Sequence, residues 1–396
     1  MKLTKIQIFV KIRCMYIQRN LEKVIKSQLF RGKVVILYGA RQTGKTTLVK
    51  HILSDYKENE IRYIDCELLS NNNLLSRGDD KELFSLVKGY KIIVFDEAQT
   101  VNRIGSILKS LHDNLPEVQY IATGSSSFDL ANQVTEPLTG RSLEYILYPI
   151  GITELVNNNY DASTEIKSFL RFGSYPGILH LKEEEKERDL NLLVTQYLYK
   201  NVLMVEGLKK PELVASLLKL LAYQIGSEAS YRELAMKLET SVPTIQKYIS
   251  LLENNFVIFR IKSFSNNKRK EVTQNRKIYF MDLGLRNALV NNFNPIEKYG
   301  RSDSGVLFEN AMILERLKYL SHCGAFGYEQ MFWRTTTQKE VDYIENYRGK
   351  IKAFEFKLNE NAKAGGVLAF KNLYKDIDVK IIDPYKIYDF VTQQSK

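Results

Sequence analysis

The chain has 396 residues, of which 44% are hydrophobic and 26% are charged. This composition excludes a disordered, collagen-like or disulfide-stapled protein, and the length predicts two or three domains. The net charge of +11 suits a polyanionic partner such as nucleic acid but is equally typical of a soluble surface. No stretch reaches the roughly 18 apolar residues of a membrane span, so we expect a soluble, cytoplasmic protein with no membrane partner.

Short apolar runs alternate with helical stretches from Arg31 to about Ile150. The runs lie at residues 34–38, 63–66, 92–95, 118–123 and 143–147. Continuous valine and isoleucine runs separated by helices are typical of strands buried on both faces, so they predict a parallel α/β sheet. Residues 1–14 show no clear period and Met15 is an alternative start, so the first domain is expected over residues 1–150 with a short extension.

A sequence of the form G-x-x-x-x-G-K-S/T follows the first strand and opens a helix. In such a loop, backbone N–H groups surround the β-phosphate and the helix N-terminus adds positive potential. Lys45 would reach the β- and γ-phosphates and the Thr46 hydroxyl would ligate magnesium, so the motif predicts ATP and Mg²⁺ as cofactors. The alternative is a glycine turn with a surface lysine. The expected nucleotide-binding residues are Gly39, Ala40, Arg41, Gln42, Thr43, Gly44, Lys45, Thr46 and Thr47.

Two acids, Asp96 and Glu97, end the apolar strand at residues 92–95. This pattern resembles a Walker B element, in which Asp96 would hold Mg²⁺ directly or through water. Glu97 would be the general base that polarises the attacking water. Together with the glycine loop, the two acids favour ATP hydrolysis.

Two further residues are candidates for contacts with the phosphates. Thr123 ends the next strand, where a polar side chain can sense the γ-phosphate or orient the water; a plain turn is the alternative. Arg141 would approach phosphates of its own subunit or of a neighbouring one, and the second case would require a homo-oligomer. A surface arginine accounts for Arg141 equally well. The catalytic residues expected in this domain are Lys45, Glu97, Thr123 and Arg141.

A helical pattern begins after the sheet. Residues 151–210 are expected to form a helical lid, and Pro211, which suits the first turn of a helix, marks the next boundary. Ser230 and Ser241 each precede a short helix and can cap it. These two helices have helix-turn-helix character, and the polar residues expected on the outer face of the second are Thr244, Gln246 and Lys247.

A winged helix is expected over residues 211–295. Two strands at residues 257–264 and 277–281 would form the wing, around a basic tip at residues 266–270 that suits a phosphate backbone. Winged helices also serve as protein-docking modules. The expected partner of this module is therefore DNA or a protein.

A second pattern of acids occupies the last hundred residues. Glu309 lies at the edge of the apolar stripe of a helix, where an unpaired carboxylate is costly. Asp342 follows in one strand, and Glu355 and Lys357 share one face of the next. The three carboxylates around one Mg²⁺, with Lys357 as a catalytic residue beside the attacking water, would serve phosphodiester hydrolysis. An ordinary cross-strand salt bridge is the alternative.

Nine segments carry a resemblance to a known family. They read LYGARQTGKTTL (37–48), FDEAQ (95–99), TGSS (123–126), LTGR (138–141), GSYP (173–176), KIYFMDLGL (277–285), FE (308–309), FWR (332–334) and EVDY (340–343). Nearly the whole chain, about residues 16–389, resembles a prokaryotic family of predicted AAA-type P-loop ATPases. The C-terminal half of that family is a domain of unknown function with a PD-(D/E)XK-nuclease-like motif. The resemblance implies ATP binding and hydrolysis, with a nuclease-like domain over residues 296–396.

Two positions depart from the usual sequence of that family. Ser174 replaces a glycine that relatives often have, and Ala40 stands where most relatives have a proline. Neither change removes a candidate residue. The acids and the lysine of the nuclease-like motif are all present.

These expectations combine into one fold class, which is α/β. An additional-strand, AAA-like P-loop sheet would be followed by a winged helix and a restriction-endonuclease-like α/β domain. The expected activity is a Mg²⁺-dependent ATPase whose nucleotide state repositions the C-terminal half, with DNA as a partner. The alternative is a slow-turnover switch in which ATP binding exposes a DNA- or protein-binding surface and the C-terminal domain is inert.

Overall fold

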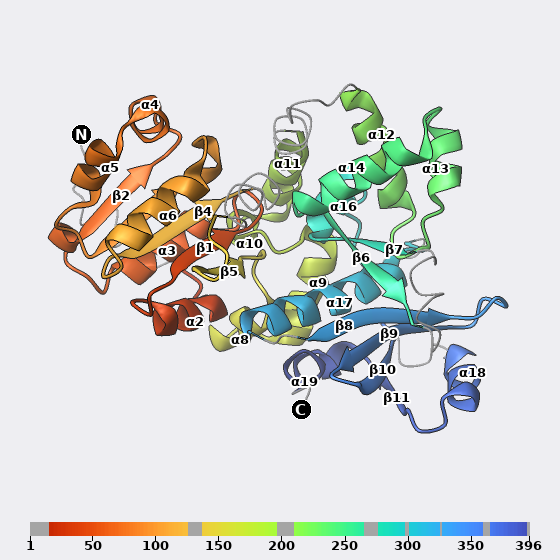
Figure 1. The fold of residues 1–396 in the computed structure, drawn as a ribbon. Helices are drawn as coiled ribbons and strands as arrows, with labels where there is room; N and C mark the ends of the chain where they lie inside the picture. Colours follow the sequence, from red (N-terminus) through yellow and green to blue (C-terminus); the bar gives the residue numbers. More distant parts are fainter. Residues whose placement is uncertain are drawn as a thin grey trace.

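Figure 1 shows the computed structural model of the chain, which describes residues 16–125, 137–195, 210–264, 276–297, 301–324, 327–358 and 365–393. Met15 with the expected N-terminal extension, Ser126 and the basic tip at residues 266–270 lie outside these ranges. Within them, no helix is long and apolar enough to cross a membrane. Two sheets organise the molecule, one near each end of the chain.

A five-stranded parallel sheet confirms the α/β domain expected near the N-terminus. The strand order is β2-β3-β4-β1-β5. The strands are β1 (Val34–Tyr38), β2 (Ile61–Asp65), β3 (Ile92–Asp96), β4 (Gln119–Gly124) and β5 (Ser142–Ile146). Every residue of β1, β3 and β4 is buried, as central strands covered on both faces require. Because all five strands are parallel, their carboxyl ends meet at one edge of the sheet.

Helices cover both faces of this sheet. They are α2 (Asn20–Gln28), α3 (Lys45–Leu53), α4 (Leu69–Arg77), α5 (Asp80–Val87) and α6 (Ile104–Asn114). Apolar residues of α2 and α3 pack with Val35 and Leu37. Those of α4, α5 and α6 pack with Val34 and Ile36. Alternate residues of β1 therefore point into different cores, which is the period-two pattern of a strand.

The middle of the chain is helical. Its helices are α8 (Ile152–Asn157), α9 (Ala162–Phe172), α10 (Pro176–Leu179), α11 (Glu183–Leu193), α12 (Pro211–Tyr223), α13 (Tyr231–Lys237), α14 (Val242–Asn254) and α16 (Leu283–Leu289). The expected caps are confirmed, because Ser230 and Ser241 each accept a hydrogen bond from a backbone N–H three residues later. Gln246 and Lys247 are exposed on α14.

The second sheet has six strands in the order β11-β10-β9-β8-β6-β7. Its strands are β6 (Ile258–Ser263), β7 (Lys277–Phe280), β8 (Tyr328–Arg334), β9 (Glu340–Tyr347), β10 (Lys350–Phe356) and β11 (Val379–Ile382). The two strands expected to form a separate wing are β6 and β7, which pair antiparallel. However, β6 also pairs with β8 through Lys262 and Ser263. The wing strands are therefore part of the C-terminal sheet, and the boundary expected after residue 295 does not separate two sheets.

The helix α17 (Ser304–His322) packs against β5 of the first sheet and β10 of the second. Its 19 residues span about 28 Å, and the last helices are α18 (Gly365–Leu373) and α19 (Ile387–Thr392). One apolar cluster contains Leu108 of α6, Phe308 of α17 and Phe354 of β10. Since this core is continuous, separating the two sheets would expose apolar surface to water.

Candidate functional site

The glycine loop after β1 has the backbone that a phosphate-binding loop requires. Gly39 has a φ of +152°, and a Cβ atom there would lie 2.3 Å from the carbonyl oxygen of Leu147. Gly44 caps the N-terminus of α3 with a φ of +95°. Glycine alone adopts such positions without strain, so both are needed for the loop to close. The loop places the N-terminus of α3 at the carboxyl edge of the sheet.

Lys45 lies buried inside this loop. Its Nζ donates hydrogen bonds to the carbonyl oxygens of Gly39 at 2.8 Å and Ala40 at 3.0 Å, while Glu97 Oε1 lies 4.0 Å away. Burial lowers the pKa of Lys45, although the carboxylates of Glu97 and Asp96 oppose this change. The close partners of the ammonium group are neutral carbonyls, and a phosphate anion is a stronger acceptor than either.

The other loop residues divide between the interior and the surface. Thr43 is buried, and its hydroxyl donates a hydrogen bond to the carbonyl oxygen of Ala40 at 2.9 Å. Arg41, Gln42 and Thr47 are exposed. Gln42 has a positive φ of 64°. The backbone of the loop is therefore set by its interior residues, while three of its side chains face solvent.

Three hydroxyl groups surround Asp96 at the end of β3. Thr46 Oγ1 donates a hydrogen bond to Asp96 Oδ2 at 3.0 Å. Thr123 Oγ1 donates to Oδ1 of the same carboxylate, and the Tyr63 hydroxyl donates to Oδ2. Because the oxygens of Thr46 and Asp96 are adjacent, a single octahedral cation can take one ligand from each. The structure thus brings three expected residues together and adds Tyr63, which only the strand order places there.

Glu97 is held in a strained and specific position. Its φ of +51° is rare for a residue other than glycine and is the kind of strain that accumulates at functional sites. Its backbone N–H donates to Thr123 Oγ1 at 3.0 Å. Gln99 Nε2 donates to Glu97 Oε2 at 2.7 Å and to Ser125 Oγ at 3.1 Å. Glu97 therefore presents its other carboxylate oxygen, Oε1, toward Lys45.

Arg141 lies at the opposite edge of the sheet from the loop. The backbone N–H of Val34, the first residue of β1, donates to the Arg141 carbonyl oxygen at 2.8 Å, whereas Gly39 follows the last residue of β1. A five-residue strand is about 16 Å long. Arg141 Nε donates instead to Asp113 Oδ1 at 2.7 Å. The expectation that Arg141 reaches phosphates of its own subunit is wrong, because residues that precede a parallel strand start at the amino edge.

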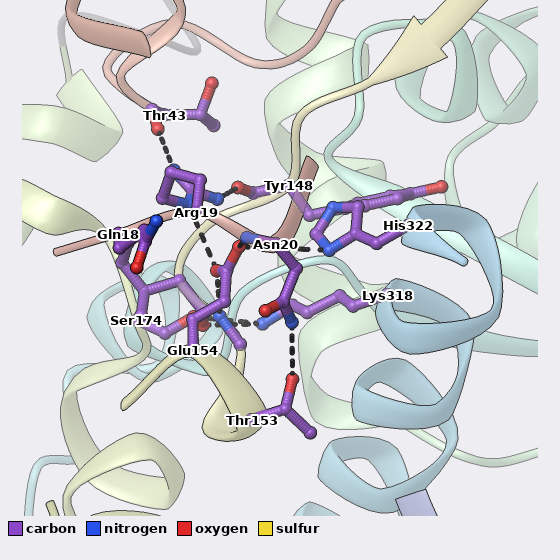
Figure 2. A network of polar contacts seen from close by, with 12 residues as sticks. Gln18, Arg19, Asn20, Thr43, Tyr148, Thr153, Glu154, Ser174, Lys318 and His322 are labelled. Atoms are coloured by element: carbon purple, nitrogen blue, oxygen red, sulfur yellow. Dashed lines mark hydrogen bonds and ion pairs between the residues drawn. The ribbon is translucent and has the colours of Figure 1, made fainter. Parts of the chain in front are cut away.

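Arg19 is a buried residue of this region that the sequence did not reveal (Figure 2). Its Nη1 donates to the carbonyl oxygen of Thr43 in the loop at 2.8 Å. Its Nη2 donates to the Tyr148 carbonyl oxygen at 2.5 Å, and its Nε donates to Glu154 Oε2 at 3.0 Å. One guanidinium group therefore ties the phosphate-binding loop to the chain after β5 and to α8. No sequence motif indicates that an arginine just before a helix will connect distant segments in this way.

The network around Glu154 continues into α17 (Figure 2). Glu154 is fully buried, and burial alone would raise its pKa, but Arg19 and other partners bring that pKa below its usual value. His322 Nδ1 lies 3.9 Å from Glu154 Oε1. Lys318 Nζ donates to Glu315 Oε1 at 2.7 Å and to Ser174 Oγ at 3.1 Å. The loop is thus connected, through buried charged groups, to the C-terminal end of α17.

The acids of the C-terminal half gather on α17, β9 and β10. Single carboxylate oxygens of Glu309, Glu340 and Asp342 all lie within 4.8 Å of one another. Burial, followed by the nearby carboxylates of Glu309 and Glu355, raises the pKa of Asp342 well above its usual value. Lys357 Nζ donates to Glu355 Oε1 at 2.7 Å. The four residues expected from the sequence are therefore brought together, with Glu340 as a fifth.

Donor atoms in this acid cluster (Glu309, Glu340, Asp342 and Glu355) suit a divalent cation. Glu355 Oε2 is buried and makes no hydrogen bond to the described residues, and a buried carboxylate oxygen without a partner is costly. Carboxylates are the ligands that Mg²⁺ and Mn²⁺ prefer. Glu309, Glu340 and Asp342 lie close enough together that they could hold one such ion.

Two residues of β7 also enter the acid cluster. Lys277 Nζ donates to Glu309 Oε1 at 2.8 Å and to Glu340 Oε1, and the Tyr279 hydroxyl donates to Glu309 Oε1. Sequence reasoning missed these residues and Glu340. A signal was present, because Lys277 and Tyr279, like Glu340 and Asp342, stand two apart in a strand and share a face.

Comparison with known families divides the chain into three matches. Residues 31–156 match the family described as "AAA domain". Residues 163–295 match "Domain of unknown function (DUF8612)", and residues 304–395 match "Domain of unknown function (DUF4143)". The first match covers the glycine loop, Asp96 and Glu97. The third covers the whole acid cluster, and the second covers Lys277 and Tyr279, which contact it.

Related proteins align with most of this chain at low identity. An uncharacterized protein of Methanocaldococcus jannaschii is 24% identical over 89% of this chain and 81% of its own length. One from Haemophilus influenzae is 24% identical over 87% of this chain and 88% of its own.

Among solved structures, AMPPCP-bound DnaA from Aquifex aeolicus is 17% identical with a TM-score of 0.31, and covers 59% of this chain and 86% of its own. That likeness is too distant to transfer a function. By sequence family, the chain carries an AAA-type P-loop domain at residues 31–156, followed by two domains of unknown function.

Proposed function

We propose that the chain hydrolyses ATP at the glycine loop and uses the nucleotide state to act on its C-terminal half. The observation that carries this proposal is the contact of Thr46 Oγ1 with Asp96 Oδ2, 3.0 Å apart, beside the buried Lys45. These groups converge at the N-terminus of α3, where backbone N–H groups favour phosphate. The match of residues 31–156 to the AAA domain supports the same activity.

Each residue of the pocket has a distinct task in this reaction. Thr46 and Asp96 would hold Mg²⁺, which would supply positive charge against the phosphates. Lys45 would turn from the loop carbonyls to the γ-phosphate. Glu97 Oε1 would accept the proton of the attacking water, while Gln99 fixes the other carboxylate oxygen. Thr123 would orient both acids, since it contacts Asp96 and the N–H of Glu97.

The affinity for ATP tests this assignment. Lys45→Ala should weaken binding of Mg·ATP by on the order of 100-fold, because charge-assisted hydrogen bonds to phosphate are lost. Isothermal calorimetry on the intact chain measures the change. Lys23→Ala removes an exposed lysine from α2 and should bind as the wild type does. An absence of heat in the wild type, or equal affinities in all three proteins, would refute the proposal.

The slow-turnover switch remains the alternative function. Arg19 connects the loop to the network at α17, so ATP binding alone can bias the C-terminal half without hydrolysis. ATP-dependent binding of DNA or a protein with negligible turnover favours the switch, whereas turnover stimulated by nucleic acid favours the ATPase. The exposed Gln246 and Lys247 on α14 support a DNA contact. For Arg141, a role at a neighbouring subunit's phosphates in a homo-oligomer remains as a proposal.

A second candidate function is Mg²⁺-dependent cleavage of phosphodiesters at the acid cluster. The buried Glu355 Oε2, which lacks a partner among the described residues, favours it. Glu309, Asp342 and Glu355 would hold the cation, and Lys357 would lie beside the attacking water. A bound cation lowers the pKa of that water and stabilises the leaving oxygen.

Cleavage of DNA tests this second function. Asp342→Asn and Glu355→Ala should each lower Mn²⁺-dependent cleavage of plasmid and single-stranded DNA by at least about 100-fold, since each removes a cation ligand. Asp376→Asn changes an exposed acid and should cleave normally. Gel assays with and without ATP measure the rates. Cleavage that persists in both acid variants, or that never occurs, would remove this function.

A further inference from the structure

We infer that Lys277 fills a cation position in the acid cluster and that a divalent cation binds by displacing its ammonium group. The inference rests on the proposed cation site, and it adds a residue and a mode of control to that site. Lys277 would be a positioning residue that keeps the cluster closed until β7 releases it.

Lys277 and a divalent cation need the same carboxylate oxygens. Lys277 Nζ contacts Oε1 of both Glu309 and Glu340, and both residues also belong to the group that converges with Asp342 within 4.8 Å. An ammonium group donates hydrogen bonds to oxygens at about 2.8 Å, whereas Mg²⁺ binds oxygens at about 2.1 Å. Both cannot occupy the centre of one cluster, so a bound cation requires the ammonium group to move.

Lys277 is only 2% exposed, so its charge must be neutralised locally. The carboxylates of Glu309 and Glu340 neutralise it, and it in turn neutralises them. A monovalent cation built into the chain therefore stabilises the cluster in the absence of a metal ion. The contact also explains how half-buried acids are tolerated on α17 and β9.

A second acceptor, Glu228, lies within reach of the Lys277 ammonium group. Glu228 forms an antiparallel bridge with Lys277, and directly opposed residues in such a pair have Cβ atoms about 5 Å apart. The Glu228 carboxylate lies 3.5 Å from Arg334 Nη1, and Arg334 Nε lies 3.4 Å from Glu340 Oε2. The displaced ammonium group can therefore pass to Glu228 while Arg334 remains with Glu340.

The position of Lys277 in the fold gives the displacement a trigger. It is the first residue of β7, which pairs with β6 on one side and is hydrogen-bonded through its backbone to residues 226–229 on the other. The other strands that carry the cluster are internal to that sheet. Residues 226–229 lead directly into α13, so a ligand at the helix-turn-helix region can act on Lys277 through Glu228 before it acts on the acids.

Titration of Mn²⁺ into the full-length, nucleotide-free chain tests the inference, with Asp96→Asn in every protein to remove the other cation site. Lys277→Met should bind Mn²⁺ at least about tenfold more tightly than the parent, because a positive charge next to the cation is gone. Lys277→Arg keeps the charge and should bind as the parent does. Lys262→Met removes a half-exposed lysine from β6 and is the matched control.

The Mn²⁺ affinities of these variants decide whether the inference holds. If Lys277→Met is the one variant that binds Mn²⁺ more tightly than the parent, the inference is supported. The same holds if the parent's own binding is too weak to measure. If the parent binds Mn²⁺, Asp342→Asn abolishes this binding and Lys277→Met does not tighten it, the cation site stands and the inference is wrong. If none of the proteins binds Mn²⁺, both the cation site and the displacement of Lys277 are refuted. Equal tightening in Lys262→Met shows a general charge effect and also overturns the inference.

Stability gives a second readout if the variant is weakened. Lys277→Met leaves buried acids without their cation, so its melting temperature should fall. Mn²⁺ should then raise the melting temperature of Lys277→Met by more than that of the parent, because it binds the folded state more tightly. The same rise in both proteins contradicts displacement.

Discussion

Glu97→Gln should bind Mg·ATP with nearly unchanged affinity but hydrolyse it about 10² to 10⁴ times more slowly. The substitution keeps the size of the side chain and its contact with Gln99, which can reorient its amide. It removes the carboxylate oxygen that faces Lys45 and so removes the acceptor for the proton of water. A phosphate-release assay at saturating ATP measures the rate, and calorimetry measures the affinity.

The matched control for this variant is Glu67→Gln, which changes an exposed glutamate near the loop residue Arg41. It should hydrolyse ATP at the wild-type rate. Equal rates in wild type and Glu97→Gln would exclude Glu97 as the general base. A loss of binding in Glu97→Gln would mean instead that the residue supports the loop rather than the proton transfer.

Arg19→Met should lower the free energy of unfolding by about 3–5 kcal/mol, the cost of leaving a buried charge without its partner. Glu154 is fully buried and relies on Arg19 for a charged hydrogen bond of 3.0 Å. The same change removes the donor to Thr43, so affinity for ATP should also fall. Urea denaturation followed by circular dichroism measures the stability.

Two variants separate the buried network from surface charge. Arg188→Met breaks an exposed pair with Asp189 and should cost less than about 1 kcal/mol. The double variant Arg19→Met with Glu154→Gln should recover part of the loss, because no buried charge is then unpaired. An Arg19→Met protein as stable as Arg188→Met would show that this network does not hold the loop to α17.

Local sequence determined the first sheet and its loop. Continuous apolar runs predicted the buried strands, and the glycine motif predicted a loop that needs positive φ at Gly39 and Gly44. Period two placed Glu355 and Lys357 on one face of a strand, and they do pair. These features depend on residues close together in the chain, so their physical causes can be read from a short window.

The tertiary structure decided every contact between distant segments. Arg19 meets Glu154 from 135 residues away, and no local pattern states which buried arginine will find which acid. The pairing of β6 with β8 turned an expected wing into part of a larger sheet, because edge strands take whichever partner the packing brings beside them.

Lys277 shows the same division within a single strand. Alternation in the sequence put Lys277 and Tyr279 on one face, but only the packing of α17 against β7 brought Glu309 to them. For Arg141, the sequence alone was sufficient. A residue that precedes a strand of a parallel sheet lies at the amino edge, away from the glycine loop. Local propensity and the period of the apolar residues therefore determine the helices and strands and the residues on each of their faces. The need to pair buried charges and the order of the strands determine which of these faces come into contact.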